Sequence, residues 1–316
     1  YSLPPPTQIN FFKSIKLEKL LSKSTIENIL DLKTLINAMK TANPSVIIHM
    51  AAQPLVRESY SSPIETFKTN VIGTANVLEA ARYTENVKAI INVTTDKCYE
   101  NLEQISPYQE NDRLGGYDPY SSSKACAELV STAYRKSFFN KCGINLATVR
   151  GGNVIGGGDW ARDRLIPDFF RALNAGKSLQ IRSPNAIRPW QHVLEPISGY
   201  LMLAEKLVID GNNYAEAWNF GPDESKARSV SQIIKHLSSS FKGSSWNIEN
   251  TPQLHEAGLL KIDSSKAKSR LGWIHQWNLE TALNKTIDWY QVWCSRGDLM
   301  FITNAQIDAY EKKIKK

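Results

Sequence analysis

The stretch Val87-Lys88-Ala89-Ile90-Ile91-Asn92-Val93-Thr94-Thr95-Asp96-Lys97 decides the fold class. It joins a nearly continuous apolar run, which has the length of a buried strand, to a polar end. Residues 46–50 and 144–149 follow the same pattern, and they end in Ala51-Ala52 and in Arg150. Strands that are apolar on both faces need cover on both sides, which is typical of parallel sheets.

Amphipathic helices are predicted between these strands, over residues 25–41, from Pro63 to about 82, and over 119–139. Asp118 can cap the last of these helices, and Pro119 suits its first turn. The alternation predicts an α/β fold with a doubly wound parallel sheet. After about residue 160 the pattern becomes less regular, which indicates a smaller α+β lobe. In such sheets ligands bind beyond the carboxyl ends of the strands, where the polar residues of this chain fall.

The charge of the chain does not point to nucleic acid. The 316 residues carry a net charge of +7, but the basic residues are spread out and the only dense run is the C-terminal Lys312-Lys313-Ile314-Lys315-Lys316. No nucleic-acid-binding module is recognisable, so we expect no nucleic-acid partner. A modest positive charge also suits an anionic small-molecule substrate.

The four cysteines, Cys98, Cys126, Cys142 and Cys294, form neither a C-x-x-C pair nor a cluster with metal-ligand spacing. We therefore expect a reducing, cytoplasmic location and no metal. No apolar stretch approaches the roughly 18 residues that a membrane span needs, so no membrane partner is expected. The chain opens on Tyr1, followed by three prolines, which we interpret as an interior point of a longer gene product.

The pair Tyr120 and Lys124 carries the strongest chemical signal. A separation of four residues places both side chains on one face of a helix. Lowering the pKa of a tyrosine from about 10 to about 7 requires roughly 4 kcal/mol of stabilisation of the phenolate, which a nearby ammonium and a cationic ring can supply. Alone, this spacing is common by chance. Its position after the strand that ends in Thr94-Thr95-Asp96-Lys97 makes it a candidate catalytic pair.

These features together resemble the extended short-chain dehydrogenases/reductases, which share the strand end His49-Met50-Ala51-Ala52, a helical Asn70, a Thr95-Asp96 pair and the Tyr/Lys pair. More narrowly, three stretches are similar to the CDP-glucose 4,6-dehydratases: Ala52-Gln53-Pro54-Leu55-Val56-Arg57, Thr94-Thr95-Asp96-Lys97-Cys98-Tyr99-Glu100-Asn101 and Gly152-Asn153-Val154-Ile155-Gly156-Gly157-Gly158-Asp159-Trp160. Arg188-Pro189-Trp190-Gln191-His192-Val193 and Leu271-Gly272-Trp273 are similar too. The resemblance covers essentially the whole chain.

The resemblance implies an NAD-dependent hydro-lyase that converts CDP-glucose to CDP-4-dehydro-6-deoxyglucose. Tyr120 would take the proton of the sugar 4-hydroxyl while NAD+ removes the C4 hydride, Thr95 would bind the 4-oxygen, and Lys124 would hold the nicotinamide ribose. Water would then leave across C5 and C6, with Asp96 as the acid for the 6-hydroxyl, before the hydride returns to C6. Lys97 would either remove the C5 proton or act electrostatically on the enolate or on Asp96.

The resemblance also implies the binding residues. The residues implied for NAD are Asn28, Ile29, Ala51, Ala52, Gln53, Asn70, Thr94, Tyr120 and Lys124, and those for the nucleotide sugar are Asn153, Arg164, Leu165 and Arg188. His49 would shape the cofactor pocket without being catalytic. Residues 1–160 would form the NAD-binding Rossmann-like domain, to which 185–212 returns, and 161–316 would form mainly the substrate-binding lobe. The helices at 63–82 and 119–139 resemble those that pair in dimeric relatives, so a homodimer is expected.

Several points depart from the family or stay open. The first strand and the Gly-rich pyrophosphate loop of the family should precede Tyr1. We therefore expect either a fragment of an active enzyme, which we favour, or a product that holds NAD poorly. Gly156-Gly157-Gly158 lacks the spacing of a dinucleotide fingerprint, so we expect a loop that passes close to the substrate. Asn28 stands where many relatives carry Asp. The Trp273, Trp277, Trp289 and Trp293 side chains are expected to pack in a core.

Alternative functions are a dTDP-glucose 4,6-dehydratase, an NAD-dependent sugar-nucleotide epimerase or a non-catalytic sugar-nucleotide-binding protein. Lys97 counts against the first, because dTDP-glucose relatives carry Glu after the Asp. The Asp96-Lys97 pair counts against the second, because an epimerase needs no acid for a leaving 6-hydroxyl. The intact Thr95, Asp96, Tyr120 and Lys124 count against the third.

Overall fold

A parallel sheet forms the centre of the computed structural model, which describes residues 1–222, 228–249, 254 and 258–315. The four strands are β1 (Val46–His49), β2 (Ala89–Val93), β3 (Asn145–Gly151) and β8 (Ala217–Phe220), in the order β1-β2-β3-β8. All three pairings are parallel. The predicted parallel sheet is therefore confirmed, and β8 adds a strand that the sequence pattern did not predict.

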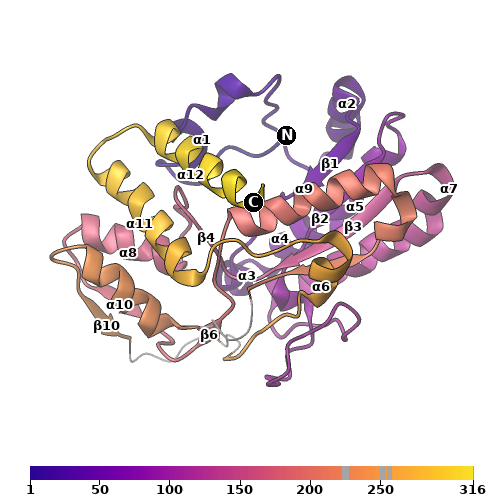
Figure 1. Cartoon of the computed structure of the whole chain (residues 1–316). Helices are drawn as coiled ribbons and strands as arrows, with labels where there is room; N and C mark the ends of the chain where they lie inside the picture. The colour runs from indigo at the N-terminus through magenta and orange to yellow at the C-terminus, as the bar shows by residue number, and fades with distance from the viewer. Residues whose placement is uncertain (223–227, 250–253, 255–257, 316) are drawn as a thin grey trace.

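Helices cover both faces of this sheet (Figure 1). On one face lie α2 (Leu32–Ala42), α5 (Gly73–Arg82) and α6 (Pro119–Tyr134), and on the other lies α9 (Leu194–Ile209). Successive side chains of β2 point to opposite faces of the sheet. Ile90 packs with Leu78 on the first face, and Ile91 packs with Leu203 on the second. The run of apolar residues in β2 is thus explained by burial on both sides.

Several helices begin or end elsewhere than predicted. Residues 25–31 are not helical, because Asp31 caps α2 by accepting a hydrogen bond from the backbone N–H of Thr34 (3.0 Å), so that the helix begins at Leu32. The helix predicted from Pro63 is divided into α4 (Pro63–Phe67), the π-turn η2 (Lys68–Ile72) and α5. The helix predicted over 119–139 is confirmed as α6 and the π-turn η4 (Arg135–Phe139), with the Asp118 carboxylate accepting from the N–H of Ser121 (2.9 Å).

The smaller elements of this part are α1 (Phe11–Ser14), η1 (Leu17–Leu20), α3 (Val56–Ser61), η3 (Asp96–Cys98) and α7 (Asn140–Cys142).

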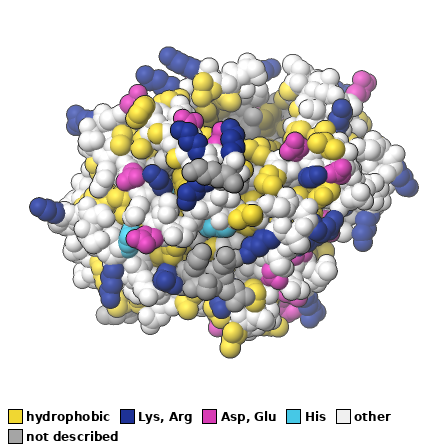
Figure 2. Space-filling view, viewed as in Figure 1, with side chains coloured by type: hydrophobic (Ala, Val, Ile, Leu, Met, Phe, Trp, Pro, Cys, Tyr) yellow, Lys and Arg dark blue, Asp and Glu magenta, His cyan; other side chains and the backbone are white. Residues whose placement is uncertain are grey.

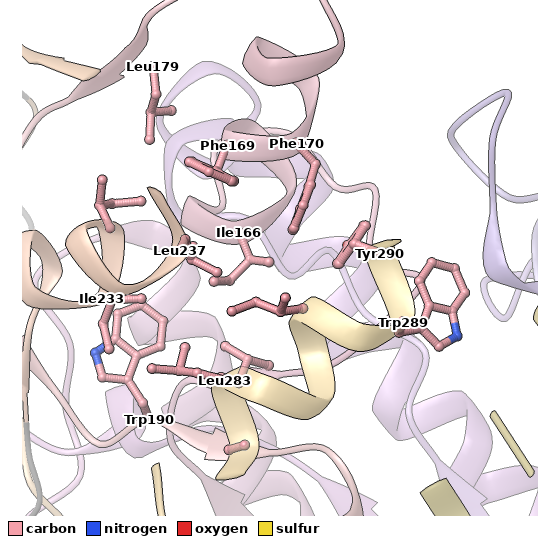
Figure 3. Packing of buried hydrophobic residues seen from close by; sticks show 14 of the residues in the cluster. Ile166, Phe169, Phe170, Leu179, Trp190, Ile233, Leu237, Leu283, Trp289 and Tyr290 are labelled. Carbon is pink, nitrogen blue, oxygen red and sulfur yellow. The ribbon is translucent and has the colours of Figure 1, made fainter. Parts of the chain in front are cut away.

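A second lobe holds its own apolar core, in which Phe170 stacks on Tyr290 with ring centroids 3.8 Å apart (Figure 3). Figure 1 shows α8, α10 and α11 gathered on one side of the molecule, away from α2 and α7. The lobe is built from α8 (Leu165–Asn174), β5 (Leu179–Ile181), α10 (Val230–Ser240), β10 (Trp246–Ile248) and α11 (Leu279–Cys294). The short pairs β4 (Val154–Ile155) with β7 (Gln191–His192) and β6 (Ile187–Arg188) with β9 (Arg228–Ser229) join it to the rest.

The tryptophans pack as predicted. Trp273, Trp277 and Trp289 are 1–2% exposed, and Trp293 packs at the margin of the second core. Trp273 follows η7 (Ala267–Leu271) and packs under α9 on the sheet, and Trp277 contacts the ring of Tyr310 on the last helix, α12 (Leu299–Ile314). The turn η5 (Gly211–Tyr214) leads from α9 to β8.

The surface carries mixed charge. Figure 2 shows Lys and Arg side chains distributed around this face and interleaved with acidic ones. None of the helices in the described part of the chain has the length and apolar character to cross a membrane. Within the same residues, no group of three or more His, Cys, Asp or Glu side chains is placed to hold a metal ion.

Candidate active site

A cleft of about 380 Å³ opens beyond the carboxyl ends of β2 and β3, between the sheet and the second lobe. This is where ligands bind in parallel α/β sheets. The cleft brings together nine of the residues predicted from the sequence, namely Thr94, Thr95, Asp96, Lys97, Tyr120, Asn153, Arg164, Leu165 and Arg188.

The segment from Thr95 to Lys97 leaves β2 with an unusual backbone. Thr95 has φ 145°, a region that a β-branched residue rarely adopts. Asp96 is 1% exposed, and its Oδ1 lies 3.6 Å from Nζ of Lys97. Its other oxygen, Oδ2, is buried and has no hydrogen-bond partner among the described residues. Leaving a buried acceptor unpaired is costly, so this oxygen is available to a ligand hydroxyl.

Tyr120 and Lys124 lie on the first two turns of α6, and both are buried. Burial raises the pKa of Tyr120 to about 12, although a hydrogen bond from Thr95 opposes the rise. Burial also lowers the pKa of Lys124 to about 8, against the charge of Glu128. The Lys124 ammonium donates to the carbonyl oxygen of Val93 (3.0 Å), at the end of β2.

Hydrogen bonds of the Asn70 side chain join the loop after β1 to α6. The Asn70 side chain accepts from the N–H of Gln53 (2.8 Å) and donates to the Gln53 carbonyl (3.0 Å) and to the Ser123 hydroxyl (2.9 Å). The loop after β1 is thereby linked through Asn70 to Ser123 on α6. His49 shares a hydrogen bond with Thr74 (3.1 Å), and burial lowers its pKa to about 3, so the imidazole is neutral. His49 is therefore neutral and enclosed, and its role in shaping the cofactor pocket stays a prediction.

Asn28 and Ile29 do not reach the cleft. The Asn28 amide oxygen accepts from the N–H of Leu30 (2.9 Å), and Ile29 is 6% exposed in the core beneath α2 and α5. The structure therefore uses both side chains for local folding, and their contact with NAD stays a prediction.

The cleft holds a set of arginines, of which two were not assigned from the sequence. Arg164 pairs with Asp159 (3.0 Å). Arg57 and Arg182 both face Asp163, with nitrogens 3.5 Å and 2.8 Å from its Oδ1. Arg57 belongs to a stretch that the family resemblance already contained. Arg182 follows the three-residue strand β5, where nothing in the local sequence indicates a site.

The remaining arginine and the nearby amide are more enclosed. Arg188 is 7% exposed and donates to the carbonyls of Ile187 and Gly258 (both 3.1 Å). The Asn153 amide oxygen is buried and has no partner among the described residues. Both groups line the cleft, and Asn153 offers a free acceptor to a ligand.

The glycine loop serves packing as well as the cleft. Gly156 lines the cleft, whereas a Cβ on Gly157 would lie 2.0 Å from the Trp289 ring and one on Gly158 would lie 2.1 Å from Phe11. Gly158 also has φ 81°, which favours glycine. Gly157 and Gly158 are therefore required by packing, and the approach of this loop to the substrate stays a prediction.

A helix that carries a tyrosine and a lysine beside the end of a parallel strand is the arrangement of the short-chain dehydrogenases/reductases. The family described as GDP-mannose 4,6 dehydratase matches residues 15–286. The CDP-glucose 4,6-dehydratase of Salmonella typhimurium is 45% identical, over 98% of this chain and 88% of that protein. The dTDP-glucose 4,6-dehydratase of Escherichia coli is 27% identical, over 83% and 78%.

Solved structures show the same fold at low identity. The dTDP-glucose 4,6-dehydratase of Streptomyces venezuelae gives a TM-score of 0.73 at 22% identity, over 87% of this chain and 81% of that one. The UDP-glucuronic acid 4-epimerase of Bacillus cereus gives a TM-score of 0.75 at 22% identity, over 89% and 85%. The chain belongs to the GDP-mannose 4,6 dehydratase family.

Proposed function

We propose that this chain is an NAD-dependent hydro-lyase that converts CDP-glucose to CDP-4-dehydro-6-deoxyglucose. The observation that carries the proposal is the identity of 45% with a CDP-glucose 4,6-dehydratase over nearly the whole chain. It is supported by the cleft, which holds Thr95, Asp96, Lys97 and Tyr120 together.

The residues at the end of β2 fit the nicotinamide half of NAD. Lys124 has three donors and uses one on Val93, so two remain for ribose hydroxyls. Bound NAD+ would supply a hydride acceptor at C4 of the sugar and the donor that later reduces C6. We assign the walls of this site to Ala51, Ala52, Gln53, Asn70 and Thr94. The hydrogen bonds between Asn70 and the backbone of Gln53 support this assignment.

Proton transfer from the sugar 4-hydroxyl falls to Tyr120. Its pKa of about 12 in the structure means that the phenolate needs further stabilisation, which the positive nicotinamide ring and Lys124 would provide. Thr95, whose side chain opposes the rise in the pKa of Tyr120, would also hold the 4-oxygen. A ketone at C4 then acidifies the C5 proton, so water can leave across C5 and C6.

The elimination step falls to Asp96 and Lys97. We assign to Asp96 the proton for the leaving 6-hydroxyl, and its Oδ2, which has no partner among the described residues, supports this assignment. The ammonium of Lys97 lies 3.6 Å from the other Asp96 oxygen. The elimination balances when the Lys97 amine takes the C5 proton, and this is the role that a Lys97→Met variant tests, whereas the contact with Asp96 supports an additional electrostatic role.

The arginines would bind the diphosphate of the substrate. Arg164 and Arg188 were expected here, and we add Arg57 and Arg182, which converge on one carboxylate in the same cleft. Two guanidinium groups held near one anion are suited to phosphate oxygens. Asn153 and Leu165 complete the proposed substrate contacts.

We further propose that the chain forms a homodimer in the cytoplasm. Ile64, Ile72 and Leu129 are 53–64% exposed on α4, η2 and α6, which pack against one another. Exposed apolar side chains on adjacent helices favour a partner helix pair. The four free cysteines suit a reducing compartment. Sedimentation of wild type and of a Leu129→Glu variant tests the dimer, which this charge should dissociate.

Mass spectrometry of the products tests the proposed activity. The chain is incubated with NAD+ and, separately, with CDP-, dTDP-, UDP- and GDP-glucose, and a Tyr120→Phe variant serves as the control. We expect loss of one water from CDP-glucose in the wild type alone. Loss from another nucleotide sugar would retain the reaction and refute the CDP assignment, and loss from none would refute the activity.

A further inference from the structure

A buried ion pair, formed by Glu128 and Arg150, lies next to the segment that carries Thr95 and Asp96. Glu128, one helical turn after Lys124 on α6, is 1% exposed, and Arg150 on β3 is 3% exposed. Arg150 donates from Nε to one Glu128 oxygen and from Nη2 to the other, both at 2.9 Å. A two-pronged contact of this kind fixes the orientation of both side chains. Although burial alone would raise it, the pKa of Glu128 lies below its ordinary value, because Arg150 and the hydrogen bonds favour the carboxylate.

The pair reaches both sides of the segment that carries Thr95 and Asp96. Before the segment, the Thr94 hydroxyl donates to Glu128 (2.6 Å). After it, Arg150 donates from Nη1 to the Tyr99 hydroxyl (2.9 Å), which in turn donates to Asn219 on β8 (2.7 Å). The two ends of residues 95–98 are therefore tied to the same ion pair.

Thr95, inside this span, is where the backbone is strained. Its φ of 145° is unfavourable for a β-branched side chain. Such strain persists only where the surroundings over-determine the conformation, and it is found at functional sites. The hydrogen bonds at Thr94 and Tyr99 restrain the backbone on both sides of Thr95.

We propose that Glu128 and Arg150 are positioning residues that hold Thr95 in its strained conformation and thereby place Thr95 and Asp96 against Tyr120. The inference rests on the proposed function for its catalytic consequence. A buried ion pair contributes little net stability compared with apolar residues of similar size, so the geometry that this pair fixes is the better explanation of its presence.

A matched pair of variants separates positioning from general packing. Tyr99→Phe removes the hydroxyl between Arg150 and Asn219 without changing the volume. Tyr310→Phe is the matched control, because it removes a hydroxyl on α12 that donates to Glu195 (2.7 Å), outside both the cleft and the ion pair. We expect Tyr99→Phe to lower kcat for CDP-glucose about 10-fold with KM unchanged, and Tyr310→Phe to leave kcat unchanged. Glu128→Gln should lower kcat as well, and its effect should not add fully to that of Tyr99→Phe, because both act on one segment.

Hydrogen exchange followed by mass spectrometry gives a readout that does not depend on activity. The amides of residues 94–99 should exchange faster in Tyr99→Phe than in wild type, with no change in Tyr310→Phe. Equal losses of kcat in both variants, or unchanged exchange and kcat in Tyr99→Phe, would overturn the proposal. A wild type that acts on no nucleotide sugar would instead refute the proposed function, and the exchange experiment would still decide whether the pair restrains the segment.

Discussion

Replacing Lys124 by methionine should stabilise the protein at neutral pH while abolishing its activity. The ammonium is buried, and this burial lowers its pKa from an ordinary 10.5 to about 8. At pH 7 the folded protein therefore carries a charge that is better solvated in the unfolded chain. Methionine has a similar length and no charge, so it removes this cost.

The size and sign of the effect follow from the pKa. The difference between pKa values of 10.5 and about 8 means that the charged Lys124 destabilises the folded protein by roughly 3 kcal/mol. Methionine removes this cost but loses the hydrogen bond to Val93, which costs about 1 kcal/mol. The free energy of unfolding should therefore rise by about 2 kcal/mol at pH 7. Because the folded pKa is the lower one, the unfolded chain binds more protons between pH 8 and 10.5. The wild type therefore gains stability relative to the variant as the pH rises through this window, and the advantage of methionine disappears by its upper end.

Urea unfolding of wild type and Lys124→Met at pH 7, 9 and 10.5 measures these differences. Lys136→Met is the matched control, because Lys136 is exposed on the turn that follows α6 and its substitution should change the free energy of unfolding by less than about 0.5 kcal/mol. A Lys124→Met protein that is less stable than wild type at pH 7, or whose advantage is independent of pH, would refute the reasoning.

Four further outcomes are expected. Asp96→Asn should lower the rate of water loss at least about 100-fold, while oxidation to the 4-ketone still occurs. Mass spectrometry of the products distinguishes the two steps, and an equal loss of both would contradict the role of Asp96 as acid. Gly157→Ala should destabilise the protein by about 1–3 kcal/mol in thermal unfolding, because its Cβ would lie 2.0 Å from the Trp289 ring, and an unchanged Tm would show that the loop can move aside. Arg182→Ala should raise KM for CDP-glucose about 10-fold with little change in kcat. Asp163→Asn should lower KM, because the carboxylate competes with the substrate diphosphate for the same arginine, and a raised KM would argue against that competition.

The geometry at the end of β2 and the start of α6 could be predicted because its signals are local. The apolar run of β2 ends directly at Thr95 and Asp96, and the spacing of Tyr120 and Lys124 on one helix fixes their common face. Parallel strands then bring these residues to one edge of the sheet, as the topology requires.

Features made by contacts between distant segments could not be predicted. Arg182 acquires its role by facing Asp163 across the cleft, and no local pattern marks that pairing. The positive φ of Thr95 is likewise a property of its surroundings and not of its sequence. The helix expected over 25–41 begins late, because the capping preference of Asp31 outweighs the apolar periodicity before it.

The position of β8 has a consequence for how the chain can be divided. The strand completes the sheet beside β3, yet it follows β3 only after the chain has formed α8, β5 and α9. Trp218 and Phe220, fully enclosed on β8, complete the core between the sheet and α9. A single cut between the two lobes would therefore remove part of the sheet along with the second lobe. The two lobes should fold as one cooperative unit, with a single unfolding transition.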